Sequence, residues 1–237
     1  GTSKPIRRKF SRINMSLSVE QFQQFLTQEN AFIIDTRDEA SFLEGFIPSS
    51  IHFKPEIIHQ AAALGLLSFE QPLLFIGADD NEKIAMAYFE KLGFSNIKGW
   101  LEGGFATWLN ADKRYDLVIE VEADELAMDI PFDEFLMVLD IRTEEQYNQG
   151  HIKNSIHFPL LEFADPGSMS ELDEHFNIYI ISEDGEPNTL AASILKKEGI
   201  HNNRVVKGGW QSILQLKDKF TIEVTKEKKA NDSLDAL

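Results

Sequence analysis

The feature that most constrains this chain is an internal repeat, in which segments recur at an offset of 105 residues. Residues 33–53 and 138–158 align without a gap, and nine of their 21 positions are identical. The identical pairs are Asp35/Asp140, Arg37/Arg142, Glu39/Glu144, Gly45/Gly150, Ile47/Ile152, Ser50/Ser155, Ile51/Ile156, His52/His157 and Phe53/Phe158. Similarity at a fixed offset indicates two copies of one structural unit, and 237 residues suffice for two domains of ordinary size.

Further segments pair in the same order: an apolar run of strand length, a helical segment that stops at glycine, and a Gly-Gly pair. They are LLFIG (73–77) and IYIIS (178–182), IAMAYFEKLG (84–93) and LAASILKKEG (190–199), and GGFATW (103–108) and GGWQSI (208–213). A glycine suits the position just after a helix. Near the start, Ser18 and Gln21 have the spacing of a capping box, which predicts a helix over Ser18–Leu26.

Strands that alternate with helices predict a parallel sheet with right-handed crossovers. The expected fold class is therefore α/β, with two tandem domains, each a mostly parallel central sheet flanked by helices. We place an N-terminal arm at 1–15, the domains at 16–113 and 114–224, and a flexible polar tail at 225–237. The copies join near 111–116 without a long linker, so we expect the domains to touch.

The sequence contains no cysteine, which excludes disulfides, thiolate metal sites and cysteine nucleophiles. Its net charge of −16 lies mostly in the second copy, because up to Asp116 there are 12 basic and 15 acidic residues and beyond it 11 and 24. Such an acidic protein is repelled by nucleic acid and by anionic membranes, so we expect neither as a partner. The six histidines show no ligand-like spacing with carboxylates, and we expect no metal and no cofactor.

No apolar run approaches the roughly 18 residues of a membrane-spanning helix. The sequence also lacks the pattern of a signal peptide, so the cytoplasm is the expected location. Five basic residues without an acid mark the first dozen positions, as an interaction arm or a frayed terminus: Lys4, Arg7, Arg8, Lys9 and Arg12. The chain begins Gly-Thr-Ser rather than with Met, which we take as a sign of an expression scar or of a piece of a longer protein.

In order, the motifs are D-x-R-x-x-x-E-[FY]-x-x-G-H-I-x-x-[AS]-I, then an apolar strand, a short loop entering a helix, and finally G-G-x-x-x-W. This combination resembles the rhodanese (sulfurtransferase) domain over about Ser16 to Phe220. The second copy matches the opening motif best, with Gly150-His151-Ile152, whereas the first has Phe46 in place of His. At the end of the Gly-Gly motif the first copy keeps Trp108 and the second has Ile213.

The resemblance implies a loop of the form C-x-x-G-x-[RTS]-[ST] after the apolar strand, whose cysteine carries sulfur as a persulfide. A thiolate of lowered pKa is the nucleophile, and loop amides with the helix N-terminus stabilise the anion. In the second copy Ser182 stands at the cysteine position, and serine cannot form a persulfide. The remaining loop candidates there are Glu183, Asp184, Gly185 and Asn188, with Gly185 at the glycine position of the family.

The loop of the first copy is one residue shorter, and Gly77 (otherwise Ala78) takes the nucleophile position. The other loop candidates are Asp79, Asp80 and Asn81, with Glu82 as a third acid. Both copies have therefore lost the nucleophile and gained acids, which oppose thiosulfate and any oxyanion intermediate. We assign no catalytic residue and expect no sulfurtransferase activity from this chain by itself.

The other motif residues are expected to be structural. Asp35/Arg37 and Asp140/Arg142 follow strands, where Asp can bind loop amides and Arg can hold a carboxylate or carbonyl. The pairs Gly103-Gly104 and Gly208-Gly209 supply backbone angles that other residues resist. By the family pattern, His151 belongs to a turn.

Three functional hypotheses follow. The first is a non-catalytic tandem rhodanese-like module that binds a protein partner or supports a sulfur-metabolism enzyme. That enzyme could be a fused metallo-β-lactamase-fold hydrolase (persulfide dioxygenase-like) of which this chain is the C-terminal piece, since its H-x-H-x-D-H signature is absent here. The second is a divergent sulfurtransferase- or phosphatase-like enzyme, and the third is a cation or cationic ligand bound by the acidic loops.

Overall fold

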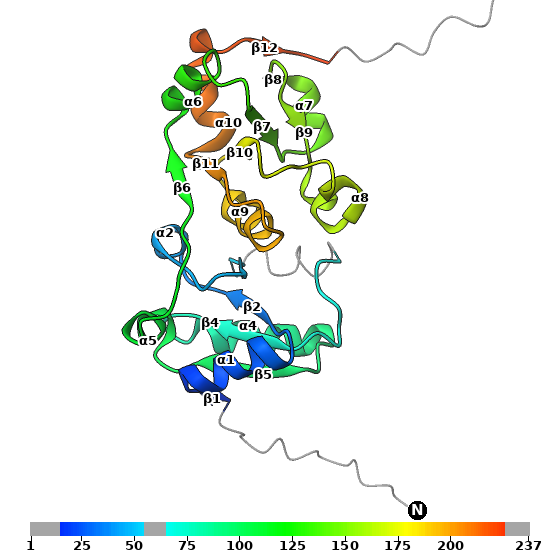
Figure 1. Ribbon diagram of the computed structural model, residues 1–237. Coiled ribbons are helices and arrows are strands. Elements are labelled where there is room, and N and C mark those ends of the chain that lie inside the picture. Colours follow the sequence, from blue (N-terminus) through cyan, green and yellow to red (C-terminus); the bar gives the residue numbers. More distant parts are fainter. Residues whose placement is uncertain (1–14, 55–64, 226–237) are drawn as a thin grey trace, which may run out of the picture.

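The computed structural model describes residues 15–54 and 65–225 and shows two α/β domains (Figure 1). The elements of the first domain are β1 (Ser16–Leu17), α1 (Val19–Gln28), β2 (Phe32–Asp35), α2 (Glu39–Glu44), β3 (Ser50–His52), β4 (Leu73–Ile76), α4 (Asn81–Leu92), β5 (Ile97–Leu101) and α5 (Gly104–Asn110). Its sheet has the strand order β1-β5-β4-β2-β3, and every pair is parallel.

The second domain repeats this plan with additions. Its elements are β6 (Ile119–Val121), α6 (Ala123–Asp129), β7 (Leu136–Asp140), α7 (Glu144–Gln149), β8 (His151–Ile152), β9 (Ile156–His157), η1 (Leu160–Ala164), α8 (Pro166–Met169), β10 (Asn177–Ile181), α9 (Asn188–Lys197), β11 (Asn203–Val206), α10 (Gly209–Gln215), η2 (Lys217–Lys219) and β12 (Ile222–Glu223). The order β6-β11-β10-β7-β9 matches that of the first sheet, and a small antiparallel pair joins β12 to β8. The expected α/β class with two parallel, helix-flanked sheets is confirmed.

Local sequence explains the main elements. Ser18 caps α1, and the reciprocal bonds between Ser18 and Gln21 form the expected capping box. Strand β4 is buried along its whole length, as expected for an apolar strand covered by helices on both faces. The backbone turns left-handed just after α4 and α9, at Gly93 and Gly199, where the φ angles are 104° and 91°.

The two domains are in contact, as the short join predicts. Helix α9 of the second domain packs on β3 and α2 of the first, and one apolar cluster contains residues from both halves. In Figure 1, α9 lies at the face of the second domain that is turned toward the first. The join itself is tied to the first domain, because Asp116 and Phe46 form an isolated antiparallel bridge.

His52 lies fully buried at this contact. Its backbone N–H donates to Ser193 Oγ at 3.1 Å, and its ring lies 2.7 Å from Thr189 Oγ1 through Nδ1 and 2.9 Å from the Arg37 carbonyl through Nε2. Because a carbonyl only accepts, Nε2 carries the proton of the neutral ring and Nδ1 accepts from the threonine hydroxyl. Burial lowers the pKa of His52 and outweighs the opposing attraction of Asp35, so the neutral ring is favoured.

A second polar contact lies beside it. Lys54 Nζ binds Glu39 of the first domain at 2.8 Å and Glu186 of the second at 2.6 Å. Burial alone would lower the pKa of Lys54, but the hydrogen bonds to the two carboxylates outweigh it and the pKa is raised. This charged lysine therefore clamps the β10–α9 loop of the second domain to the first.

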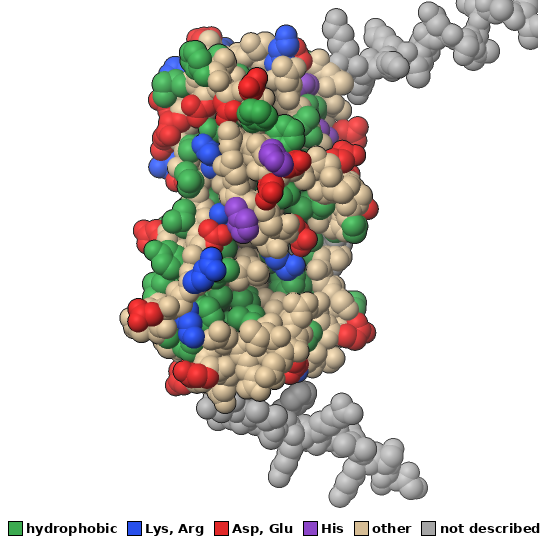
Figure 2. All heavy atoms as spheres, in the orientation of Figure 1, with side chains coloured by type: hydrophobic (Ala, Val, Ile, Leu, Met, Phe, Trp, Pro, Cys, Tyr) green, Lys and Arg blue, Asp and Glu red, His purple; other side chains and the backbone are tan. Residues whose placement is uncertain are grey.

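The expected basic arm and polar tail lie outside the described residues, apart from their inner ends at Met15 and Thr225. On the face drawn in Figure 2, lysine and arginine side chains of the described chain stand scattered among acidic ones, without a continuous basic area. Within the described ranges, no helix is long and apolar enough to cross a bilayer.

Candidate functional site

The two candidate loops lie at equivalent places in the two domains. Each follows a central strand of its sheet, β4 or β10, and leads into a helix, α4 or α9. In open parallel sheets, ligands bind outside the carboxyl ends of the strands, where loops meet helix N-termini. The structure thus places Gly77 and Ser182 where this fold offers a binding site.

In the second domain the loop closes around Ser182. The side chain is buried, and its Oγ accepts the backbone N–H of Gly185 at 3.0 Å. Within the described chain, this hydroxyl makes no hydrogen bond to a His, Asp or Glu side chain. A serine nucleophile needs an adjacent base to take its proton, and in the described chain the partner of Ser182 Oγ is a backbone amide.

The Gly208-Gly209 pair braces this loop from the other side. Both glycines have positive φ, and the N–H of Trp210 donates to the Ser182 carbonyl at 2.7 Å. A Cβ on Gly209 would lie 2.7 Å from the Gly185 nitrogen, which is too close for any side chain. The glycine pair therefore allows the α10 N-terminus to approach the loop backbone.

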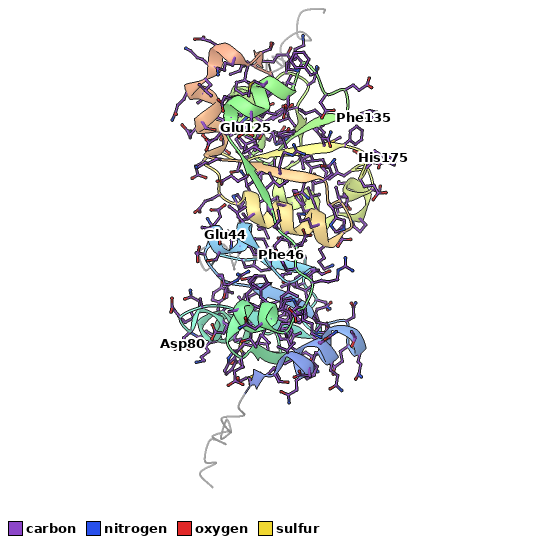
Figure 3. All side chains as sticks on the ribbon, turned by 60° about the vertical axis from the view of Figure 1, so that its left-hand side comes forward. Glu44, Phe46, Asp80, Glu125, Phe135 and His175 are labelled. Carbon is purple, nitrogen blue, oxygen red and sulfur yellow. The ribbon has the colours of Figure 1, made fainter. Side chains whose placement is uncertain are left out.

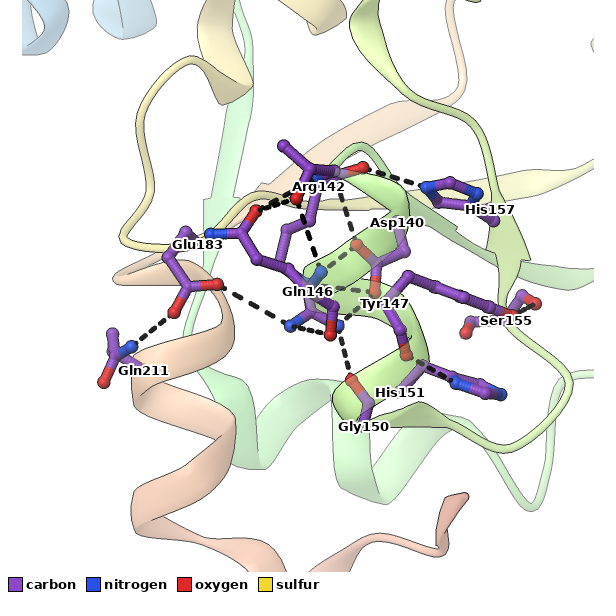
Figure 4. A network of polar contacts seen from close by, with 11 residues as sticks. Asp140, Arg142, Gln146, Tyr147, Gly150, His151, Ser155, His157, Glu183 and Gln211 are labelled. Atoms are coloured by element: carbon purple, nitrogen blue, oxygen red, sulfur yellow. Dashed lines mark hydrogen bonds and ion pairs between the residues drawn. The ribbon is translucent and has the colours of Figure 1, made fainter. Parts of the chain in front are cut away.

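The side chain of Glu183, in the second loop, points toward Arg142 (Figure 4). Its Oε2 lies 3.6 Å from Arg142 Nη1, and its Oε1 accepts from Gln211 at 2.6 Å. Arg142 also binds the Asp140 carboxylate and stands 4.0 Å from the centre of the Trp210 ring. The acid of this loop is thus already paired with a guanidinium group of the chain itself.

The D-x-R motif performs the same structural task in both domains. Arg142 donates to Asp140 and to the Gly150 carbonyl at 2.7 Å, which ties the strand end to the end of α7. In the first domain Arg37 binds Asp35 and the Gly45 carbonyl in the same way, with Phe105 over the guanidinium at 4.4 Å. Both arginines are buried between a carboxylate and an aromatic ring.

In the first domain, the carboxylate of Glu82 takes the place of a side chain at Gly77. A Cβ built on Gly77 would lie too close to Glu82 Oε2 for any real contact, 2.6 Å from the Glu82 nitrogen and 2.9 Å from its Cβ. Glu82 is 8% exposed, and Oε2 has no hydrogen-bond partner within the described chain. Gly77 therefore offers no side chain at the nucleophile position, and the Glu82 side chain occupies the space where one would lie.

The remaining acids of the first loop lie at its rim. Asp79 and Asp80 both have left-handed backbones, with φ of 55° and 66°. Asp80 precedes α4 without capping it and pairs with Lys83, and this hydrogen bond raises the pKa of the lysine. Figure 3 shows Asp80 at the edge of the first domain, away from Phe46 and the contact with the second.

Two hollows flank the backbone of Gly77 and Ala78. One, of about 290 Å³, is lined by Ala78, both aspartates, Glu82, Trp100 and the glycines Gly77, Gly103 and Gly104, together with Leu101. The other, of about 460 Å³, has Arg37, Phe105, Leu109 and Tyr115 among its lining residues. Gly104 again permits close approach, since its Cβ would lie 2.9 Å from the Gly77 carbonyl.

Other sequence candidates lie apart from the loop centres. His151 begins strand β8, which pairs with β12, so it lies in a short strand and not in the expected turn. Its ring stacks on Tyr147 at 3.9 Å, and its Nδ1 lies 2.9 Å from the Tyr147 carbonyl. Asn188 is buried and donates to the Val206 carbonyl at 3.1 Å. Asn81 begins α4, and Asp184 accepts the Glu186 N–H within its own loop.

In the sequence Glu82 stands out only as one of three acids near the first loop, His52 only as a repeated residue, and Lys54 not at all. The signal for Glu82 is the combination of a glycine at the nucleophile position with an acid in the first turn of the next helix. No such signal exists for the domain contacts of His52 and Lys54, because Thr189 and Glu186 lie more than 130 positions away in the other domain.

Among the described residues, no group of three or more His, Asp or Glu side chains is arranged to hold a metal ion.

Fold and loop geometry define a tandem of parallel α/β domains, each with a strand–loop–helix cradle. The family model described as "Rhodanese-like domain" matches residues 18–111 and 122–216. The chain therefore belongs to the rhodanese-like family, with two tandem domains that both lack the cysteine.

Its relatives include proteins named for sulfur chemistry. The "Putative sulfur carrier protein YrkF" of Bacillus subtilis is 35% identical over 80 residues, which cover 34% of this chain and 42% of that protein. The "Thiosulfate sulfurtransferase GlpE" of Pseudomonas savastanoi is 30% identical over 86 residues, covering 36% of this chain and 78% of that protein. The chain thus matches less than half the length of the Bacillus relative.

Among solved structures, the 3-mercaptopyruvate sulfotransferase SseA from Escherichia coli is similar over 83% of this chain and 98% of its own. Its sequence identity is 16% and the TM-score is 0.38.

Proposed function

We propose that this chain is a non-catalytic tandem rhodanese-like module that binds a protein partner or supports a sulfur-metabolism enzyme, as a separate chain or within one polypeptide. The observation that carries the proposal is the state of the two cradles. Glu82 fills the first beside Gly77, and the second holds a serine hydroxyl bound to a loop amide.

Electrostatics support the same conclusion. Persulfide chemistry needs a thiolate and a loop that stabilises negative charge. The first loop instead carries Asp79, Asp80 and Glu82, while Glu183 lies against Arg142 in the second. Thiosulfate and mercaptopyruvate are anions, so the acids of the first loop repel the donors that a sulfurtransferase uses, and in the second loop Glu183 already neutralises the nearby arginine.

The direct test is sulfur transfer from thiosulfate or mercaptopyruvate to cyanide by the pure chain. We expect the rate to equal that of a protein-free blank. A rate above the blank that survives repurification would overturn the proposal.

The binding role is tested separately, with the intact chain as bait in the native organism's extract. We expect recovery of a sulfur-metabolism enzyme. A Lys54→Ala variant used as bait tests whether partner binding needs the contact between the two domains. If the chain recovers no protein that an unrelated acidic bait does not also recover, the binding role is contradicted. That result would give no support to a catalytic role.

A further inference from the structure

The pocket beside Gly77 contains an unsatisfied buried charge-bearing group. Glu82 lines this pocket and is 8% exposed, and its Oε2 lacks a hydrogen-bond partner within the described chain. Leaving such a group unpaired in a protein interior costs free energy. The carboxylate is directed into the loop, because it occupies the space that a Gly77 side chain would fill.

The charge around this pocket favours a cation. Asp80 is neutralised by Lys83, but Asp79 makes no ion pair with any basic side chain of the described chain. Glu82 lies in the first turn of α4, so its own carboxylate already meets the positive end of that helix. An incoming ligand therefore encounters two carboxylates rather than free helix amides.

An aromatic face completes the pocket. Trp100 lines it, and the Lys83 ammonium already lies 5.3 Å from the centre of the indole ring. Cations bind the faces of tryptophan rings, and the planar guanidinium group can also stack on them. This corner of the domain thus already attracts one cation of the chain itself.

The same chain shows which cation fits such an arrangement. Arg37 and Arg142 each lie between a carboxylate and an aromatic ring, at 4.4 and 4.0 Å from the ring centres. In the second domain, Arg142 also pairs with the loop acid Glu183. In the first domain Glu82, at the start of α4, has no arginine partner among the described residues.

We propose that the pocket lined by Glu82, Asp79 and Trp100 binds a guanidinium group from outside the chain. The Glu82 carboxylate accepts its N–H donors and Asp79 adds charge at the rim. The Trp100 ring offers the aromatic face in exchange for the Lys83 ammonium, which lies 5.3 Å from the ring centre in this structure. The volume of about 290 Å³ lies at the small end of ligand sites, which suits a side-chain-sized group. This inference rests on the proposed binding role and names the chemistry that one of its loops recognises.

The test is calorimetry and ¹⁵N NMR of the full chain with three probes: N-acetyl-arginine methylamide, free arginine and N-acetyl-lysine methylamide. We expect saturable one-to-one binding of an arginine probe, weaker binding of the lysine probe, and a shift of the Trp100 indole resonance. Tighter binding of the blocked arginine assigns the site to a peptide side chain, and tighter binding of free arginine assigns it to the amino acid.

Variants separate the pocket from the overall charge. Glu82→Gln keeps the shape of the side chain and should weaken arginine binding about tenfold or more, as expected for loss of a charge-assisted pair. Glu90→Gln removes the same charge from an exposed position of α4 and should leave the affinity within about twofold. If Glu82→Gln unfolds the protein, Trp100→Leu replaces it and should weaken binding as well.

The inference is overturned if the wild-type chain binds no arginine probe, if the lysine probe binds equally well, or if Glu90→Gln weakens binding as much as Glu82→Gln. None of these results affects the proposed absence of catalysis. Conversely, sulfur transfer by the pure chain would refute the proposed function and leave the arginine measurement standing.

Discussion

Gly77 offers the sharpest test of how the first cradle is filled. Replacing it by alanine adds one methyl group, which would lie 2.6 Å from the backbone nitrogen of Glu82 and 2.9 Å from its Cβ. The Glu82 carboxylate can rotate away, but the nitrogen belongs to the first turn of α4 and moves only with the helix. The substitution therefore shifts the α4 N-terminus or strains the loop.

The expected cost is that of overpacking a filled site, about 1–3 kcal/mol. One apolar cluster contains residues of both domains, so we expect the two domains to unfold together. For a unit of this length, about 2–4 °C of melting temperature is lost per kcal/mol, which gives a decrease of about 2–12 °C.

The assay is thermal and urea unfolding of Gly77→Ala against wild type. The matched control is Gly167→Ala in α8, where alanine favours the helix and the added Cβ meets only the flexible Asp165 carboxylate, 3.0 Å from the Oδ2 atom that caps α8. Adding Glu82→Ala to Gly77→Ala should leave most of the Gly77→Ala cost in place, because the nitrogen and Cβ of residue 82, at 2.6 and 2.9 Å, remain. A Gly77→Ala protein as stable as wild type would refute a cradle filled by Glu82.

Three further predictions concern the domain contact and the second loop. The pKa of His52 is lowered in the folded protein, so the unfolded chain binds the proton first as the pH falls. The free energy of unfolding, measured with urea, should therefore decrease below about pH 6.5. The difference in this free energy between wild type and His52→Gln should shrink in the same range. Lys54→Met removes the bridge to Glu186 and should destabilise the protein by about 1 kcal/mol in the same assay, with a smaller loss at high salt. Gly209→Ala places a Cβ against the Ser182 loop at a φ of 53° and should cost about 3 kcal/mol or more by thermal unfolding.

Each of these has its own control. Gly199→Ala shares a positive φ, at 91°, but meets no atom within 4 Å, so it should lose only about 1–2 kcal/mol; an equal loss at both glycines would show that crowding at the loop is not the cause. Lys153→Met, whose partner Glu223 is exposed, should change stability little. A pH profile of His52→Gln parallel to wild type would contradict the burial of a neutral ring.

Much of the architecture follows from sequence, because the duplication shows the same alternation of strands and helices twice. The capping box at Ser18, the apolar strand ending at Ile76 and the glycines after α4 and α9 are local patterns with local causes. The absence of a cysteine at Gly77 and Ser182 is likewise a property of composition, and no folding can restore it.

Tertiary structure decides what the duplicated residues do. His52 and His157 are identical in the repeat, and both ring Nε2 atoms lie 2.9 Å from an arginine carbonyl. Yet His52 is sealed beneath α9, whereas His157 stays partly exposed and stacks on Tyr147 at 4.6 Å. The preceding isoleucines differ in the same way, with Ile51 1% and Ile156 44% exposed.

The physical reason is that burial and pairing depend on which element from the other end of the chain covers a site. Sequence alone determined that this protein has two rhodanese-like units without a cysteine, because those are matters of repeat, pattern and residue identity. Only the folded chain brought Glu82 into the space beside Gly77 and Glu183 against Arg142. Whether a loop acid is paired or left unsatisfied is set by these contacts, and they lie outside the reach of any local pattern.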